Sequence, residues 1–288
     1  MASAGRPWET SSLLVGLLLF LAAAAGYFFL RPYPVGNPRK KHLFPFPLNP
    51  HTTLPSPPLP SSRTIVVGDV HGCLIELQAV LGKLGVDPDR DVVVFVGDLV
   101  NKGPSSAEVL RFIRLMKNAY SVRGNHDEAA VTVYCAGAPY PPKYAWLSQV
   151  SESDMSFLKE LPYTITLPHH NATVVHACLD SRFPLSRQDP VVMTTARTFS
   201  DLNPPLPLPS PASAPSLPPP SWSASYSGSP FGTVLYGHDA VRGVNITRFA
   251  KGIDAGCCYG RDLAVYVFEH AGDTRGKLVC FERGKDLF

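Results

Sequence analysis

Short runs of apolar residues, each followed by glycine and polar residues, recur along the chain from Arg63 onward. The continuous runs Thr64–Val67 and Val92–Val96 predict strands that are buried on both faces. Apolar residues at helical spacing follow at Leu74–Leu84 and at Ser105–Lys117, where serine is a residue type that caps helices. This alternation of strand and helix predicts an α/β protein built around a layered sheet.

Further segments have the composition of strands. A third strand is predicted at Tyr120–Arg123, because it ends at a glycine in the same way as the first two. The later predicted strands are Ala172–Val175, Thr233–Tyr236, Leu263–Glu269 and Leu278–Glu282.

Proline divides the chain into parts. The sequence has 30 prolines in 288 residues, and they gather between Pro32 and Pro60 and between Pro204 and Pro230. Such stretches do not build a packed core. We therefore expect an N-terminal tail with a membrane helix at 1–30, a Pro-rich linker at 31–62, and one domain at 63–288. Within that domain, a disordered Pro/Ser-rich insertion is expected at about 203–230.

The uncharged stretch Thr10–Leu30 is long enough for a transmembrane helix, which needs about 20 apolar residues. A cleavable signal peptide is the alternative, because small residues gather at Ala22–Gly26. The basic residues after the helix favour a cytosolic domain. Two glycosylation triplets, at Asn171 and Asn245, suit a lumenal one. These residues leave open the side of the membrane on which the domain lies.

Charge and cysteine usage exclude several classes of protein. The net charge is only +3 and no basic run is interleaved with aromatic residues, so polymeric nucleic acid is not expected as a partner. The cysteines form no C-x-x-C pair, which argues against a zinc ribbon and a disulfide framework. We expect buried free thiols at Cys73, Cys135, Cys178, Cys257, Cys258 and Cys280.

Acidic, amide and imidazole side chains follow the predicted strands. The first strand leads into Gly-Asp-Val-His-Gly at 68–72, the second into Gly-Asp-Leu-Val-Asn-Lys-Gly-Pro at 97–104, and the third into Arg-Gly-Asn-His-Asp at 123–127. His176 and His238 follow two later strands. Ligands bind at this end of the strands in open α/β sheets, so these motifs are expected to meet.

These residues offer two Asp, one Asn and three His as metal ligands. Such mixed oxygen and nitrogen donors suit two divalent ions chosen from Zn, Mn, Co and Fe. A carboxylate such as Asp98 can bridge two ions because it has two oxygens. The predicted ligands are Asp69, His71, Asp98, Asn125, His176 and His238.

The same motifs supply groups for phosphate hydrolysis. The ions activate water, and Asp98 is catalytic as their shared ligand. His126 can protonate the leaving oxygen as general acid. Arg123 and Lys102 can bind phosphate oxygens.

These residues resemble the calcineurin-like metallophosphoesterases of the phosphoprotein-phosphatase type, from Arg63 to the C-terminus except for the insertion. The resemblance implies a layered α-β-β-α sandwich with one metal held by Asp69, His71 and Asp98. The second metal would be held by Asp98, Asn125, His176 and His238. His126 matches the catalytic acid and Arg123 a phosphate binder.

Within the family the chain is most similar to the ApaH-like group, through residues 97–104 and 124–127 and the segment Ile-Asp-Ala-Gly-Cys-Cys-Tyr-Gly at 253–260. Arg197 looks like a further phosphate-contacting residue of that group. The protein phosphatases have aspartate where Asn101 stands. A neutral amide cannot stabilise a protonated His126 as a carboxylate would, so the tuning of that histidine is left open.

The resemblance implies a phosphohydrolase that cleaves phosphoanhydride bonds in inorganic polyphosphate or dinucleoside polyphosphates. A membrane span before an ApaH-like domain is similar to the yeast vacuolar zinc-dependent endopolyphosphatase. That likeness favours polyphosphate and a domain in the vacuolar lumen. The alternatives are a Ser/Thr protein phosphatase with partners docking on the Pro-rich insertion, and a non-enzymatic membrane scaffold.

Overall fold

A computed structural model describes residues 47–55, 57, 59–202 and 220–281. Its strands form two mixed sheets, one of six strands in the order β1-β5-β6-β7-β9-β8 and one of five in the order β11-β10-β2-β3-β4. The prediction of an α/β fold is therefore confirmed, and the two sheets are those expected of an α-β-β-α sandwich.

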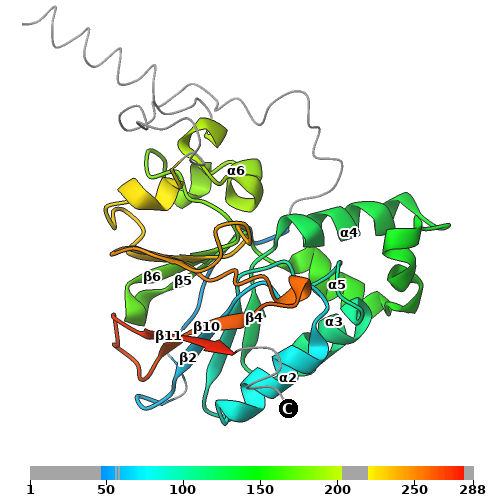
Figure 1. The fold of residues 1–288 in the computed structure, drawn as a ribbon, viewed down its shortest axis with the longest axis horizontal. Coiled ribbons are helices and arrows are strands. Elements are labelled where there is room, and N and C mark those ends of the chain that lie inside the picture. The colour runs from blue at the N-terminus through cyan, green and yellow to red at the C-terminus, as the bar shows by residue number, and fades with distance from the viewer. Residues whose placement is uncertain (1–46, 56, 58, 203–219, 282–288) are drawn as a thin grey trace, which may run out of the picture. The chain divides into compact units, whose positions relative to one another are not determined.

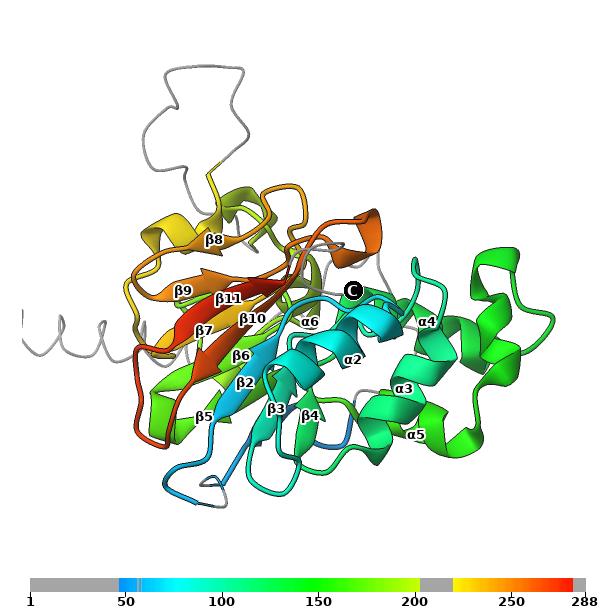
Figure 2. The same ribbon diagram turned by 60° about the horizontal axis from the view of Figure 1, so that its bottom comes forward.

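The five-stranded sheet carries the first three predicted strands side by side (Figure 2). β2, β3 and β4 are parallel, whereas β10 is antiparallel to both β2 and β11. Parallel strands direct their carboxyl ends to one edge, so the loops after β2, β3 and β4 are neighbours. The strands are β2 (Thr64–Val67), β3 (Val92–Phe95), β4 (Ala119–Ser121), β10 (Leu263–Phe268) and β11 (Lys277–Phe281).

The six-stranded sheet brings two further predicted strands together. β6 and β7 are parallel neighbours, so the residues that follow them also lie close to each other. β9 continues this parallel group, and β5 runs antiparallel to β6. The strands are β1 (His51–Thr53), β5 (Thr164–Leu167), β6 (Ala172–Val175), β7 (Thr233–Tyr236), β8 (Asn245–Ile246) and β9 (Ala250–Gly252).

Helices cover the outer faces of the two sheets (Figure 1). Those on the five-stranded sheet are α2 (Leu74–Lys83), α3 (Ser106–Leu115), α4 (Asn125–Ala136), η1 (Pro142–Gln149) and α5 (Glu152–Glu160). Those on the six-stranded sheet are α6 (Pro190–Thr195) and η5 (Trp222–Ser225). The remaining short helices are η2 (Pro168–His170), η3 (Leu185–Arg187), η4 (Phe199–Asp201) and η6 (Cys257–Tyr259).

Alternate side chains of the central strands fill two different cores. Ile65 and Val93 pack against the helices, whereas Val66 and Val94 pack between the two sheets. Because successive side chains of a strand point to opposite faces, an unbroken apolar run is what this double burial requires. The four layers are therefore helix, sheet, sheet and helix.

Two boundaries in the predicted domain plan need correction. β1 lies within the stretch predicted as a linker, yet it pairs in parallel with β5 from His51 to Thr53. Residues 220–230 lie within the stretch predicted to be disordered, but Trp222 is 3% exposed and its indole nitrogen donates to the Ala177 carbonyl at 3.0 Å. An extended strand and one large aromatic side chain are enough to attach these segments to the core, despite the prolines around them.

Among the described residues, no helix combines the length and the apolar character that a membrane crossing requires. The membrane helix predicted at residues 10–30 lies outside the described residues. The span and the vacuolar location therefore stay predictions.

Candidate active site

Both sheets deliver side chains to one place. Asp69 and Asp98 lie in the loops after β2 and β3, Asn125 begins α4 after β4, and His176 and His238 follow β6 and β7. The sheets are joined there by a hydrogen bond in which the His238 N–H donates to the Asp69 carboxylate at 3.2 Å. The predicted convergence of the motifs is thus present in the structure.

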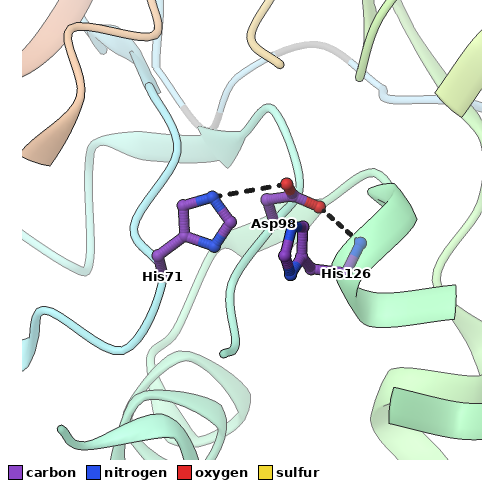
Figure 3. Close-up of side chains that lie close together, drawn as sticks. All are labelled: His71, Asp98 and His126. Carbon is purple, nitrogen blue, oxygen red and sulfur yellow. Dashed lines mark hydrogen bonds and ion pairs between the residues drawn. The ribbon is translucent and has the colours of Figure 1, made fainter. Parts of the chain in front are cut away.

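Asp98 occupies the centre of this arrangement and is 2% exposed. One of its oxygens lies 3.4 Å from His71 Nε2, and the other lies 3.4 Å from His176 Nε2. The latter oxygen also accepts the His126 main-chain N–H at 2.8 Å. Figure 3 shows the carboxylate between the His71 ring and the main chain of His126. Each oxygen of Asp98 therefore faces a different histidine.

Hydrogen bonds to carbonyl groups fix which ring nitrogen each histidine presents. Nδ1 of His71 lies 3.0 Å from the Val100 carbonyl, and Nδ1 of His176 lies 2.8 Å from the Val96 carbonyl. His238 uses the other nitrogen, since its Nε2 lies 3.1 Å from the Thr195 carbonyl. A carbonyl only accepts, so these nitrogens carry the proton. The opposite nitrogen of each ring then has a lone pair for a metal.

The donors present fit two divalent metal ions. His71, Asp98 and His126 offer ligand atoms within 4.8 Å of one another, and so do Asp98, His176 and His238. Asp98 belongs to both groups, as a bridging carboxylate would. Two further predicted ligands border them: Asn125 Oδ1 lies 3.1 Å from His176 Nε2, and Asp69 lies 3.9 Å from His71 Nε2.

Burial and neighbouring charge set the protonation of these groups. Burial lowers the pKa of His71 to about 4, so this imidazole is neutral, as a ligand must be. Burial also lowers the pKa of His126, although Asp98 opposes it. Burial alone would raise the pKa of Asp98, but the charge of His176 and its hydrogen bond hold that pKa below its usual range. Asp98 is therefore the ionised carboxylate of the site.

Asp69 has a second acidic neighbour that the motifs did not assign. Burial raises the pKa of Asp69, and the nearby carboxylates of Asp254 and Asp98 raise it further. Asp254 is 4% exposed and its pKa is raised, chiefly by burial. Buried carboxylates this close repel one another unless cations lie between them. This group of buried carboxylates is a second indication that the site binds metal ions.

Asp127, also unassigned, connects the loops that carry the ligands. Its buried carboxylate accepts main-chain N–H groups of Asp98 at 2.8 Å, Leu99 at 2.9 Å and Gly124 at 2.8 Å. Asp127 lies in the first turn of α4, where an acidic side chain is favoured by the exposed N–H groups. An aspartate at that position of the predicted motif was the signal available in the sequence.

Close approach of the loops explains two of the glycines. A Cβ on Gly124 would collide with Asp98, and a Cβ on Gly237 would collide with Asp69. Strain is also concentrated here, because five described non-glycine residues of these loops have φ between 48° and 69°. Such conformations persist where surrounding contacts over-determine them. They are His71, Asp98, Asn101, Lys102 and His238.

Lys102 reaches the centre of the site. Its Nζ lies 2.8 Å from His71 Nε2 and 5.1 Å from the centre of the Tyr259 ring. Burial disfavours the ammonium, but interactions with Tyr259 and Asp98 raise the pKa of Lys102, so it stays charged. The phosphate-binding role of Lys102 stays a prediction.

Asn101 acts on the main chain of His126. Its amide nitrogen donates to the His126 carbonyl at 3.0 Å, and its oxygen accepts from Trp146 Nε1 at 3.1 Å. The amide therefore positions the turn that carries His126 instead of supplying a charge to its ring. The His126 ring lies edge-on to His71, with 4.8 Å between centroids.

The two predicted arginines differ sharply. Arg197 lies at the rim: its side chain is 44% exposed, with Nε 3.6 Å from Asp239 and a terminal nitrogen 3.1 Å from the His238 carbonyl. Arg123 is 0% exposed and donates to Glu128 at 2.9 Å and to the Lys159 carbonyl. Its guanidinium is turned into the core, so the structure does not support the phosphate-binding role predicted for Arg123.

A family model for calcineurin-like phosphoesterases matches residues 62–242, more than half of the chain. The chain belongs to the calcineurin-like phosphoesterase family. Its sequence is similar to an asymmetrical bis(5'-nucleosyl)-tetraphosphatase of Halalkalibacterium halodurans, at 30% identity over 70% of this chain and 89% of the relative.

Three other matches differ in identity and in the share of the chain that they cover. A symmetrical bis(5'-nucleosyl)-tetraphosphatase of Pectobacterium carotovorum is 46% identical over 28% of this chain, and the chain spans 29% of that relative's length. A crystal structure named as a candidate diadenosine tetraphosphatase matches with a TM-score of 0.65 and 31% identity, covering 82% of this chain and 99% of that one. A protein serine/threonine phosphatase of Saccharomyces cerevisiae, at 16% identity and a TM-score of 0.50 over 82% of this chain and 84% of that one, shows only the shared fold.

Proposed function

We propose that this protein hydrolyses phosphoanhydride bonds of dinucleoside polyphosphates with the help of two divalent metal ions. Support comes from the tetraphosphatase of Halalkalibacterium halodurans, because the match covers most of both chains. The similar crystal structure, also named for a diadenosine tetraphosphate substrate, supports the same substrate class.

The observation that carries the proposal is the position of Asp98. Its two oxygens face His71 and His176, and both rings are oriented by carbonyl groups behind them. A shared carboxylate between two sets of oriented nitrogen ligands is the arrangement that a two-metal hydrolase needs.

Bound metal ions would activate water and neutralise charge on the phosphoryl group. Side chains of this protein would donate the proton and bind the phosphate groups. His126 lies next to His71 and is half-buried, so it can donate a proton to the departing phosphate oxygen. Lys102 extends an ammonium into the centre, and Arg197 offers a guanidinium at the rim, where a long anionic substrate enters.

Inorganic polyphosphate contains the same linkage and was the substrate first expected from the sequence. The tetraphosphatase relatives favour the dinucleoside class instead. For the protein-phosphatase alternative, the reported comparison with a protein serine/threonine phosphatase shows only the fold. All three substrates therefore belong in one experiment.

The experiment uses the full-length chain, because removing residues up to Pro60 would also remove β1. The protein is loaded in turn with Zn, Mn, Co and Mg, and is incubated with diadenosine tetraphosphate, long-chain polyphosphate or a phosphothreonine peptide. We expect metal-dependent cleavage of diadenosine tetraphosphate, and its nucleotide products show which anhydride is cut. Turnover of the peptide alone would replace the proposal with a protein phosphatase, and turnover of polyphosphate alone would restore the first expectation.

A further inference from the structure

A second group of metal-ligating side chains lies beside the candidate active site. Cys73 is the residue before α2, Glu76 lies in the first turn of α2, and Cys257 begins η6. Their sulfur and carboxylate oxygen atoms lie within 4.8 Å of one another. All three are buried, with exposures of 4%, 8% and 1%. Of the three such groups among the described residues, only this one contains no residue of the active site.

The donor set differs from that of the active site. Two sulfurs and one carboxylate favour a borderline to soft divalent ion, above all Zn²⁺. Three anionic ligands would need compensation, and the N-terminus of α2 directs the positive end of its macrodipole to this point.

The two sulfurs are already in contact. The hydrogen bond between the thiols of Cys257 and Cys73, together with burial, raises the pKa of Cys257. A metal ion would therefore have to displace protons as it binds.

We propose that Cys73, Glu76 and Cys257 bind one zinc ion that is separate from the two ions of the active site. The three side chains leave one position of a tetrahedron for water. The ion would link the first turn of α2 to η6. Both segments border the active site, since Cys73 Sγ lies 4.0 Å from the His71 carbonyl and η6 ends at Tyr259, which contacts Lys102. The ion would thus hold the two loops together without contacting substrate. This inference does not depend on the substrate proposed above.

Cobalt offers a direct test, because thiolate ligands give Co²⁺ an intense near-ultraviolet charge-transfer absorption that oxygen and nitrogen ligands do not give. The full-length chain, reduced and freed of metal, is titrated with Co²⁺ and then with Zn²⁺. We expect the thiolate absorption to appear with one equivalent of Co²⁺ and to disappear when Zn²⁺ replaces it. The same absorption is expected in Asp98→Asn, because the active site supplies no sulfur.

Substitutions of the two cysteines test whether they bind the ion. Cys73→Ser and Cys257→Ser should lose the absorption, and each should bind one zinc fewer per chain by elemental analysis. Cys178→Ser, a buried cysteine in a different core, should keep both. Absence of the absorption in the wild-type protein overturns the proposal, whether or not the variants fold. Retention of the absorption in both serine variants overturns it as well, as does a Cys73–Cys257 disulfide in the freshly purified chain.

Discussion

The two sheets contribute to the active site in different ways. The loops of the five-stranded sheet are tied to each other: His71 N–H donates to the Asp98 carbonyl at 2.8 Å, and Gly72 N–H donates to the Leu99 carbonyl at 2.9 Å. Asp127 adds three more main-chain contacts to the same loops. On the six-stranded sheet, Arg197 contacts the segment of His238 only through its side chain, which is 44% exposed.

From this difference we expect the two sheets to have different roles in catalysis. The interlocked loops hold Asp98 and His126 in fixed positions, which favours chemistry that depends on alignment. In the proposed site, the six-stranded side would complete the metal ligands and would present an exposed cation, Arg197, to the substrate. Variants on the first side should therefore reduce turnover, and a rim variant on the second side should mainly weaken substrate binding.

The largest effect is expected from Asp98→Asn. The amide cannot bridge two cations with two anionic oxygens, and the loss of several kcal/mol of transition-state stabilisation corresponds to about a thousandfold lower kcat. Turnover and bound metal should be measured together. Asp91→Asn is the control, because Asp91 is also buried but pairs with Arg63. Equal losses of turnover in the two variants would contradict the assigned role.

His126→Asn should lower kcat by about 10²- to 10⁴-fold on an anhydride substrate, the range for loss of a general acid. The loss should be smaller with p-nitrophenyl phosphate, since its leaving group departs without a proton. Comparing the two substrates separates proton donation from positioning. An identical loss on both would show that His126 does not act as the acid.

Asp127→Asn tests the hydrogen bonds that connect the loops of the five-stranded sheet. The variant keeps the size of the side chain but weakens its hydrogen bonds to Asp98, Leu99 and Gly124. Residues that orient metal ligands typically contribute 10- to 100-fold to metal affinity or activity, so a loss of about that size is expected. Titration with metal ions would measure the loss of affinity. Asp154→Asn removes a buried carboxylate paired with Arg114 on α3, and it should lower the melting temperature while metal affinity stays the same.

Arg197→Ala is expected to have the smallest effect on catalysis. An exposed cation that contacts a phosphate contributes about 1 kcal/mol, so KM should rise about fivefold while kcat changes little. Steady-state kinetics on diadenosine tetraphosphate would show it. A proportional fall in kcat with unchanged KM would place Arg197 in the chemical step.

Arg123→Met provides the sharpest contrast with that variant. Removing the buried guanidinium leaves the Glu128 carboxylate without its cation, which costs about 3 kcal/mol or more. Thermal unfolding should shift clearly downward, and KM of the protein that remains folded should not rise. A raised KM at unchanged stability would restore the phosphate-binding role predicted from the sequence.

The sequence predicted the central fold well because burial on both faces leaves an unbroken apolar run. The predicted strands at Thr64–Val67, Ala172–Val175 and Thr233–Tyr236 have the observed bounds. The ligands could be predicted for a related reason, since they directly follow those strands. β1 was missed because three residues between prolines carry almost no periodic signal, and its pairing with β5 is set by tertiary contact.

Side-chain direction was the part that the sequence could not provide. Arg123 precedes the motif that contains His126, so proximity in sequence suggested that it faces the substrate. Its partner Glu128 lies in the first turn of α4, and only the folded helix brings that carboxylate to the guanidinium. The cysteines show the same limit: Cys135 and Cys280 were expected to be buried, but both are exposed.

β1 also has a mechanical consequence. Its three residues are paired with Thr164, Ile165 and Thr166, and the Pro50 carbonyl accepts the Tyr163 N–H at 2.8 Å. A pull on the chain before His51 would thus be transmitted first to β5 and to the turn at Pro162. The Pro162 carbonyl in that turn accepts the Arg123 N–H at 2.7 Å. The next residue, Gly124, packs against Asp98. Tension on the N-terminal segment would accordingly reach the catalytic loops through the backbone.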